Sequence, residues 1–213
     1  MEFCGVREQF GMSDQPQRKL PTVDPTWWFD GDLPGLDDAT GEQTIQASLS
    51  TWSKWCALLW SKAATKASAT LLIITTRIDG PSNVLADCQL PYPGMKQLLM
   101  RLDLERFTTK LNPDGGYIGL PHVIAHEGGH AEGLMHLAFD ATPDLMNQTY
   151  RKDIWEPQAD EGSIVKSLYG SPRPMPPPAT PPAGSHPLVL PVRLEFDAYG
   201  GTYSARGTAK RNT

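Results

Sequence analysis

The chain has 213 residues, with 19 lysines and arginines against 24 aspartates and glutamates, so its formal net charge is −5 at pH 7. This length suits one domain of moderate size with room for a core. Because the sequence contains neither a basic run nor an interleaved basic and aromatic stripe, we expect no nucleic-acid or anionic-membrane partner. The cysteines, Cys4, Cys56 and Cys88, are odd in number, so they cannot all pair within one molecule.

Targeting and membrane-spanning segments are not recognisable in the sequence. The first residues, MEFCGVREQF, have neither a basic n-region nor an apolar h-region, and the run LLII at 71–74 is too short to span a bilayer. We therefore expect no membrane span, and either a soluble protein inside the cell or an export signal outside this chain. The compartment is unknown from the sequence.

The hydrophobic pattern predicts strands alternating with helices. The segment WWF (27–29), bounded by Pro25 and by Asp30-Gly31, predicts a first strand. The segments TLLIITTRI (70–78) and NVLADCQL (83–90) predict two more strands. Between the first and second of these strands, apolar residues at steps of 4, 3, 4 and 3 predict one face of an amphipathic helix: Ile45, Leu49, Trp52, Cys56 and Leu59. The expected fold class is α/β (α+β), with a mixed sheet backed by helices.

A second helix is expected from Leu120 into the segment HEGGHAEGLMH (126–136). Residues four apart share one helix face, so His126 and His130 can bind one metal ion, and Glu127 can reach a water bound to that ion as a general base. Gly128 and Gly129 inside this helix cost about 1 kcal/mol each relative to alanine, so packing or the metal must hold it.

Gly133 explains how a third histidine can join the first two. Glycine terminates helices readily, so the chain can turn there and bring His136 back towards the metal. Three imidazoles and a water form the open tetrahedral zinc site that catalysis uses, whereas structural sites are usually closed by four protein ligands. The spacing therefore favours a catalytic zinc site. We interpret His122 as a residue of the helix start or the core.

The pattern HExxHxxGxxH followed by Met146 is the signature of the metzincin zinc peptidases. Within that clan the chain most resembles the matrixins, the matrix metalloproteinase family, over most of residues 4–170. The resemblance also rests on four segments in the family's order, namely SLSTWSKWCALLW, ATLLIITTRIDGPSNVLADCQLPYPG, LDLERFT and DEGSIVKSLYG. It implies a metzincin-like domain with a mixed twisted sheet backed by helices and the active-site helix below it.

The resemblance also implies a zinc metalloendopeptidase and roles for individual residues. His126, His130 and His136 would hold one catalytic zinc, Glu127 would be the general base, and Met146 would form an apolar floor beneath the metal. Substrates would lie extended along the edge strand at Val84, Leu85 and Ala86. The pocket for the residue after the scissile bond, expected to be apolar, would be walled by Gln148, Thr149 and Tyr150, although the family usually has proline where Gln148 stands.

Two metal sites of the family are altered in this sequence. Asp87 stands where a histidine of the second, structural zinc is expected, and Arg101-Leu102-Asp103 lacks another, so we expect that zinc to be absent. Asp79, Asp103 and Glu105 resemble the calcium ligands, with the spacing of the last two shortened. The alternative is that these three are solvated turn carboxylates.

Both ends of the chain differ from its centre. The segment CGVREQF, beginning at Cys4, resembles a degraded copy of the family's inhibitory cysteine motif, so Cys4 is either a latent zinc ligand or a thiol in a frayed terminus. From Ser171 the composition is proline-rich, with nine prolines by Pro191. We expect a propeptide-like segment at 1–20, a catalytic domain at 21–170, and a linker and tail at 171–213.

The residues leave two alternatives to an endopeptidase that cleaves internal bonds of protein or peptide substrates. One is a catalytically silent zinc-binding protein that keeps the fold. The other is a zinc hydrolase that acts on peptide ends. We expect a monomer, and the family resemblance suggests an extracellular protein.

Overall fold

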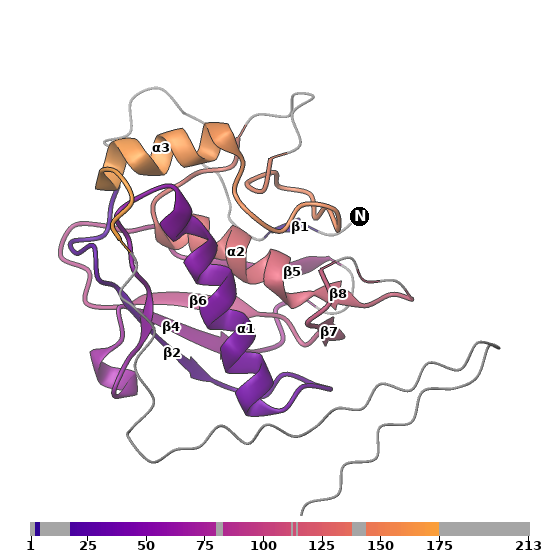
Figure 1. The fold of residues 1–213 in the computed structure, drawn as a ribbon. Coiled ribbons are helices and arrows are strands. Elements are labelled where there is room, and N and C mark those ends of the chain that lie inside the picture. The colour runs from indigo at the N-terminus through magenta and orange to yellow at the C-terminus, as the bar shows by residue number, and fades with distance from the viewer. Residues whose placement is uncertain are drawn as a thin grey trace, which may run out of the picture. The chain divides into compact units, whose positions relative to one another are not determined.

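A six-stranded mixed sheet forms the centre of the fold (Figure 1). The computed structural model describes residues 18–79, 83–111, 113, 115–137 and 144–174, and the backbone of residues 3–4. The strand order is β1-β5-β6-β4-β2-β3. These strands are β1 (Phe3–Cys4), β2 (Thr26–Asp30), β3 (Ser61–Lys62), β4 (Leu71–Thr75), β5 (Val84–Cys88) and β6 (Leu98–Leu102). A separate pair consists of β7 (Phe107–Thr108) and β8 (Ile118–Gly119).

One strand gives the sheet its mixed character. β5 pairs antiparallel with β6, whereas β6 pairs parallel with β4 and β4 pairs parallel with β2. Along β6 the side chains alternate between buried and half-buried, and β4 begins in the same way. Each large apolar side chain that such alternation buries contributes about 1.5–3 kcal/mol relative to an exposed one. The mixed sheet expected from the sequence is therefore confirmed.

The first helix is shorter than its apolar pattern predicts. α1 spans Asp38–Ser50 and is capped by Asp37, whose carboxylate accepts a hydrogen bond from the Thr40 amide at 2.9 Å. A 3₁₀ turn over Thr51–Lys54 follows it. The expectation that one helical face continues through Cys56 to Leu59 was wrong, because the chain leaves the helix and the Leu59 amide donates to the Val23 carbonyl at 2.9 Å. Cys56 is nevertheless fully buried.

Two further helices complete the fold. α2 spans Leu120–Ala131 and has a proline in its first turn, and α3 spans Ala159–Tyr169 and ends at Gly170 with φ 83°. α1 and α2 cross in contact with each other, and α2 also contacts β5 (Figure 1). None of the helices described is long and apolar enough to cross a membrane. The contact between α2 and β5 places the histidine segment beside the edge region of the sheet.

Candidate active site

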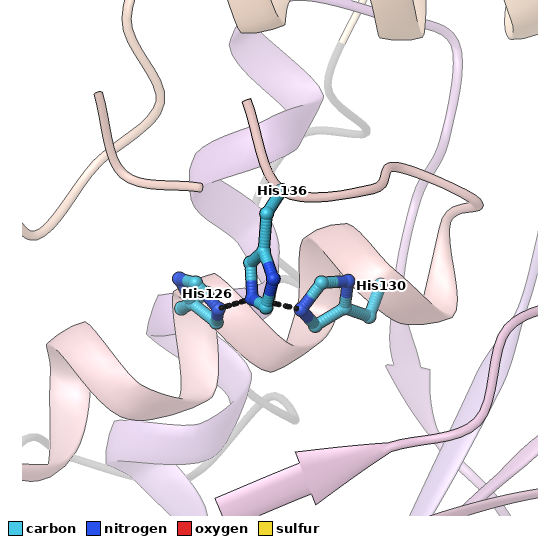
Figure 2. Close-up of side chains that lie close together, drawn as sticks. All are labelled: His126, His130 and His136. Atoms are coloured by element: carbon cyan, nitrogen blue, oxygen red, sulfur yellow. Dashed lines mark hydrogen bonds between the residues drawn. The ribbon is translucent and has the colours of Figure 1, made fainter. Parts of the chain in front are cut away.

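Three histidines point their imidazole rings at one centre (Figure 2). His136 Nε2 lies 3.3 Å from His126 Nε2 and 3.2 Å from His130 Nε2. Within the described ranges, these residues are the one group of three or more His, Cys, Asp or Glu side chains whose ligand atoms all lie within 4.8 Å of one another. His122 does not belong to this group. The structure thus brings His136 back to the two histidines of α2, where a turn at Gly133 was expected to place it.

Backbone carbonyl groups fix the orientation of two of these rings. His126 Nδ1 lies 2.6 Å from the Leu145 carbonyl oxygen, and His130 Nδ1 lies 2.8 Å from the Leu134 carbonyl oxygen. A carbonyl oxygen only accepts hydrogen bonds, so in the neutral rings each Nδ1 carries the proton and each Nε2 presents a lone pair to the centre. Converging lone pairs repel one another unless a cation lies between them. The donor set therefore fits a divalent metal ion such as zinc.

Burial keeps the three rings neutral. Desolvation lowers the pKa of His126 to about 4 and that of His136 to about 3, and it lowers the pKa of His130 well below its usual value. Neutral imidazoles are the form that binds metal, so no proton has to leave these rings at neutral pH before a cation binds.

Gly133 makes the turn that brings His136 to the other two rings. Its φ is 100°, a left-handed conformation that side-chain-bearing residues rarely adopt. A Cβ atom at this position would lie 1.9 Å from the Arg18 carbonyl oxygen. The Gly133 amide donates to the His130 carbonyl at 2.9 Å, which closes the end of α2. Both the backbone conformation and the close approach of the residue-18 backbone therefore require glycine here.

Gly129 allows Met146 to approach the metal-binding helix. A Cβ atom at Gly129 would lie 2.4 Å from Met146 Sδ and 2.8 Å from Trp52 Cζ2. Met146 is fully buried. Trp52 also donates from its indole nitrogen to the Ala125 carbonyl oxygen at 2.9 Å. Close packing against Met146 and Trp52 at Gly129, and against Leu49 and Trp52 at Gly128, thus accounts for these two helix glycines.

Glu161 anchors the segment that carries Met146, and the sequence reasoning missed it. This glutamate is fully buried on α3, and its carboxylate accepts hydrogen bonds from the Met146 amide and, at 2.7 Å, from the Gln158 amide. Leu145, which precedes Met146, is the residue whose carbonyl orients His126. A signal was available, because a glutamate in the first turn of a predicted helix often makes a capping box. Glu161 therefore positions a histidine through the backbone of residues 145–146.

A pocket opens beside the histidines, and the predicted base Glu127 is among the residues that line it. The pocket is open to solvent, and its lining residues are Leu85, His122, Val123, His126, Glu127, Asn147, Gln148 and Tyr150. Of the residues predicted for substrate binding, Leu85, Gln148 and Tyr150 line this pocket, whereas Val84, Ala86 and Thr149 do not. His122, Val123 and Asn147 were missed. The position of His122, one helical turn before His126, was the signal that could have identified it.

The carboxylates that resemble calcium ligands do not gather into a cluster. Asp103 is buried, and its Oδ1 accepts the amides of Ile78 and Leu104 at 2.9 and 2.8 Å. Asp79 Oδ1 accepts a hydrogen bond from the Val84 amide at 3.2 Å. Glu105, two residues after Asp103, is also buried. Together they do not meet the 4.8 Å spacing that the histidines meet. The structure therefore gives no support for calcium binding.

Asp87, which replaces an expected zinc-binding histidine, pairs with an arginine across the sheet. It lies opposite Arg101 in the antiparallel β5–β6 register, and Arg101 Nε donates to Asp87 Oδ1 at 2.8 Å, with a second bond from the guanidinium to Oδ2. The bond to Asp87 raises the pKa of Arg101. This two-point ion pair joins the strands where the family resemblance implied a second metal.

The backbone of Cys4 lies beside the predicted substrate strand. β1 pairs parallel with β5, with Phe3 opposite Val84 and Cys4 opposite Ala86. The side chain of Cys4 lies outside the described part of the structure. Cys56 and Cys88 are both buried free thiols.

Known proteins match this chain over most of its length. A model of the matrixin family matches residues 19–170. Human matrix metalloproteinase-27 is 30% identical over 210 residues, which cover 92% of this chain and 38% of the relative. Mouse stromelysin-1 is 26% identical over 202 residues, covering 89% of this chain and 39% of the relative. The chain thus spans less than two fifths of the length of either relative.

Proposed function

The chain belongs to the matrixin family of metzincin-fold zinc peptidases, and on this premise we propose that it hydrolyses internal peptide bonds of extended protein substrates. We propose His126, His130 and His136 as the ligands of one zinc ion. The observation that carries this proposal is the convergence of three Nε2 lone pairs, two of them fixed by carbonyl groups on the far side of the rings.

Glu127 is the general base of the proposed reaction. It follows His126 on α2, is buried, and lines the pocket together with His126. A bound zinc ion supplies Lewis acidity, which acidifies water and polarises a peptide carbonyl. Glu127 takes the proton of the attacking water and later returns it to the leaving amine, so no acyl-enzyme forms. Met146 supports this arrangement as the apolar floor.

We propose that an extended substrate peptide binds as an additional strand alongside β5. Val84, Leu85 and Ala86 would offer backbone hydrogen bonds to an extended peptide, and this mode leaves alternate side chains of the peptide to select pockets. Leu85 also lines the pocket beside His126, so backbone pairing and side-chain recognition would meet at one residue. Gln148, Thr149 and Tyr150 belong to the segment that forms the opposite wall.

We also propose that the N-terminal segment keeps the enzyme partly latent. The pairing of Phe3 and Cys4 with β5 supports this idea, because a peptide substrate would need the same strand. The Leu20 amide donates to the Tyr169 hydroxyl at 2.8 Å, which ties the chain to α3 at the far end of the segment. A thiolate from Cys4 would complete the zinc coordination and exclude water.

The remaining assignments are likewise proposals. We assign residues 1–20 to a propeptide-like segment, 21–170 to the catalytic domain, and 171–213 to a linker and tail, for an extracellular monomeric enzyme. A catalytically silent zinc-binding protein is the second candidate. The pairing of β1 with β5 favours it if the N-terminal segment stays on β5 permanently and blocks substrate. Nothing in the pocket favours cleavage at peptide ends.

A panel of fluorogenic peptides with free and blocked termini tests the proposed function. We expect the zinc-loaded protein to cleave blocked peptides internally and to lose this activity with a chelator. Zinc content at one ion per chain without turnover of any peptide, even after residues 1–17 are removed, would favour the silent zinc-binding protein. Cleavage restricted to free termini would favour an exopeptidase.

A further inference from the structure

We propose that Tyr169, in the last turn of α3, is a positioning residue for the metal centre. Its hydroxyl holds residues 132–134, which follow α2 and which we call the metal-site turn. Two of the three histidines depend on this turn for their positions. The inference rests on the proposed zinc site, and it concerns how the protein holds the ligands rather than which residues they are.

The metal-site turn serves two of the proposed ligands. The Leu134 carbonyl oxygen lies 2.8 Å from His130 Nδ1 and so orients that ring. His136 follows two residues after Leu134, so the course of the turn decides where its ring lies. The Leu134 amide donates to the Gly129 carbonyl at 2.9 Å, which closes the turn onto α2. A displacement of the turn would therefore affect both rings together.

Tyr169 supplies a hydrogen bond that α2 cannot make internally. The last carbonyl groups of a helix have no amide partner within it. Glu132 caps α2 and is fully buried, and the Tyr169 hydroxyl donates to its carbonyl oxygen at 2.7 Å. Burial raises the pKa of Tyr169, so the hydroxyl keeps the proton that it donates. Without this hydroxyl, the Glu132 carbonyl would have no hydrogen-bond partner among the described residues, at a place where a missing partner is costly.

The same hydroxyl accepts a hydrogen bond from the N-terminal stretch of the domain. The Leu20 amide donates to it at 2.8 Å, and Leu20 is buried. Because one side of the hydroxyl oxygen is occupied by this amide, its proton is directed towards Glu132. The Arg18 carbonyl reaches the metal-site turn directly, since a Cβ atom at Gly133 would lie 1.9 Å from its oxygen. The turn is thus held from outside α2 at two points.

α3 supports the metal centre at both of its ends. Glu161, in its first turn, holds the segment whose Leu145 carbonyl orients His126. Tyr169, in its last turn, holds the metal-site turn, which serves the other two ligands. The two positions lie about 12 Å apart along the helix axis. All three proposed ligands therefore depend on a helix that contributes none of them.

Tyr169→Phe in the full chain tests this inference. The substitution keeps the ring and its packing and removes only the hydroxyl. We expect zinc affinity, measured by competition with a chromophoric chelator, to fall by about fivefold or more. The visible absorption spectrum of the Co²⁺-substituted protein, which depends on ligand geometry, should change as well. A role in folding alone would lower stability without changing either readout in the folded protein.

Ser53→Ala is the matched control for the loss of a buried hydroxyl. Ser53 is buried, and its hydroxyl also donates to a backbone carbonyl, that of Leu58, at 2.7 Å. This bond closes the loop between residues 53 and 58 rather than the metal-site turn. We expect a comparable loss of stability in chemical denaturation, with zinc affinity within about twofold of wild type and an unchanged Co²⁺ spectrum.

Replacement of Tyr169 with 4-aminophenylalanine restores a donor at the same place. Its amino group can donate to the Glu132 carbonyl, so zinc affinity should return to within about twofold of wild type. This variant carries the test if Tyr169→Phe does not fold. Weakened zinc binding in it, at wild-type stability, would overturn the inference.

The possible results separate this inference from the proposed function. Unchanged zinc affinity and an unchanged Co²⁺ spectrum in Tyr169→Phe would overturn the role of Tyr169 and leave the endopeptidase proposal intact. An equal fall in zinc affinity in Ser53→Ala would also overturn it, because general loosening of the fold would then explain the effect. Weaker zinc binding in Tyr169→Phe alone, without cleavage of any peptide by the wild type, would support the inference and overturn the endopeptidase proposal. A wild-type protein that binds neither zinc nor Co²⁺ would overturn both.

Discussion

Two of the three histidines at the proposed metal centre, and the segment that carries Met146, are each held in place by a second group. His126 is oriented by the Leu145 carbonyl, His130 by the Leu134 carbonyl, and the segment before Met146 by the buried carboxylate of Glu161. Supporting groups of this kind fix the tautomer and the direction of a metal-binding ring. The centre is therefore expected to be sensitive to substitutions that never touch the metal.

His136→Ala tests the residue on which the turn argument depends. It removes one of three converging nitrogen ligands and leaves the α2 pair, so zinc affinity should fall by at least about a hundredfold and peptidase activity should disappear. Competition with a chromophoric chelator measures the affinity. His122→Ala is the matched control, because that histidine lies outside the cluster and its loss should leave zinc binding largely unchanged. Unchanged zinc affinity in His136→Ala would show that the third ligand is another residue.

The sequence predicts the metal-binding residues better than the residues that support them. His126, His130 and His136 stand in one short segment, and helix geometry with a glycine turn is enough to bring them together. Glu161 and the pocket face of His122 depend on contacts with residues distant in the chain, such as Met146 and Tyr150. The capping-box spacing of Glu161 and the place of His122 one turn before His126 were local signals, but a single sequence has no periodic signal for the distant contacts themselves.

At the level of secondary structure, the turn after α2 combines an unusual backbone conformation with a close contact. Gly133→Ala should place a methyl group against the Arg18 carbonyl and strain the left-handed backbone. We expect a loss of more than about 2 kcal/mol in the free energy of unfolding, together with weaker zinc binding, because His136 follows this turn. Chemical denaturation and zinc competition measure the two effects.

Gly94 provides the matched control for that prediction. Its φ of 77° is also positive, but a Cβ atom there would meet nothing within 4 Å. Gly94→Ala should therefore cost only about 1 kcal/mol of backbone strain and leave zinc binding unchanged. Equal stability losses in the two variants, with zinc binding retained in both, would show that the contact with Arg18 does not hold the turn.

The apolar pattern of the sequence predicts the secondary structure correctly where tertiary packing favours the same element. The predicted strands near 27–29, 70–78 and 83–90 correspond to β2, β4 and β5. The observed β2 is one residue longer at each end than predicted, whereas β4 and β5 are shorter. α1 ended early because the buried positions at Trp52 and Cys56 are filled by a 3₁₀ turn and a loop, which an apolar spacing cannot distinguish from a helix. β6, in the middle of the sheet, was not predicted, although Leu98, Met100 and Leu102 alternate.

For the whole molecule, the pairing of β1 with β5 is the feature that local sequence could least predict. A strand of two residues has no periodicity, and its conformation depends on the partner strand. Charge and length excluded partner classes but carried no information about this contact. The N-terminal segment is therefore where an experiment on the full chain adds most.

Removal of residues 1–17 tests the proposed latency while keeping the described contacts of Arg18 and Leu20. We expect peptide turnover to rise several-fold, because the β5 edge becomes free for substrate. Cys4→Ser in the full chain should give a smaller rise, since it removes the thiolate but keeps the strand. Buried Cys56, whose pKa is raised to about 12, is the control site, and Cys56→Ser should produce no activation. Equal turnover in the full chain and in the truncated protein would contradict the latency.

The central claim is that three histidines hold zinc while Glu127 moves the proton, and Glu127→Gln separates these two roles most directly. Glutamine keeps the size and hydrogen-bonding capacity of the side chain but cannot accept the proton. The measurement is kcat/KM on a blocked peptide together with zinc content in the same preparation. We expect about one zinc ion per chain and activity lower by about a hundredfold or more. Full zinc content with wild-type turnover would contradict the account.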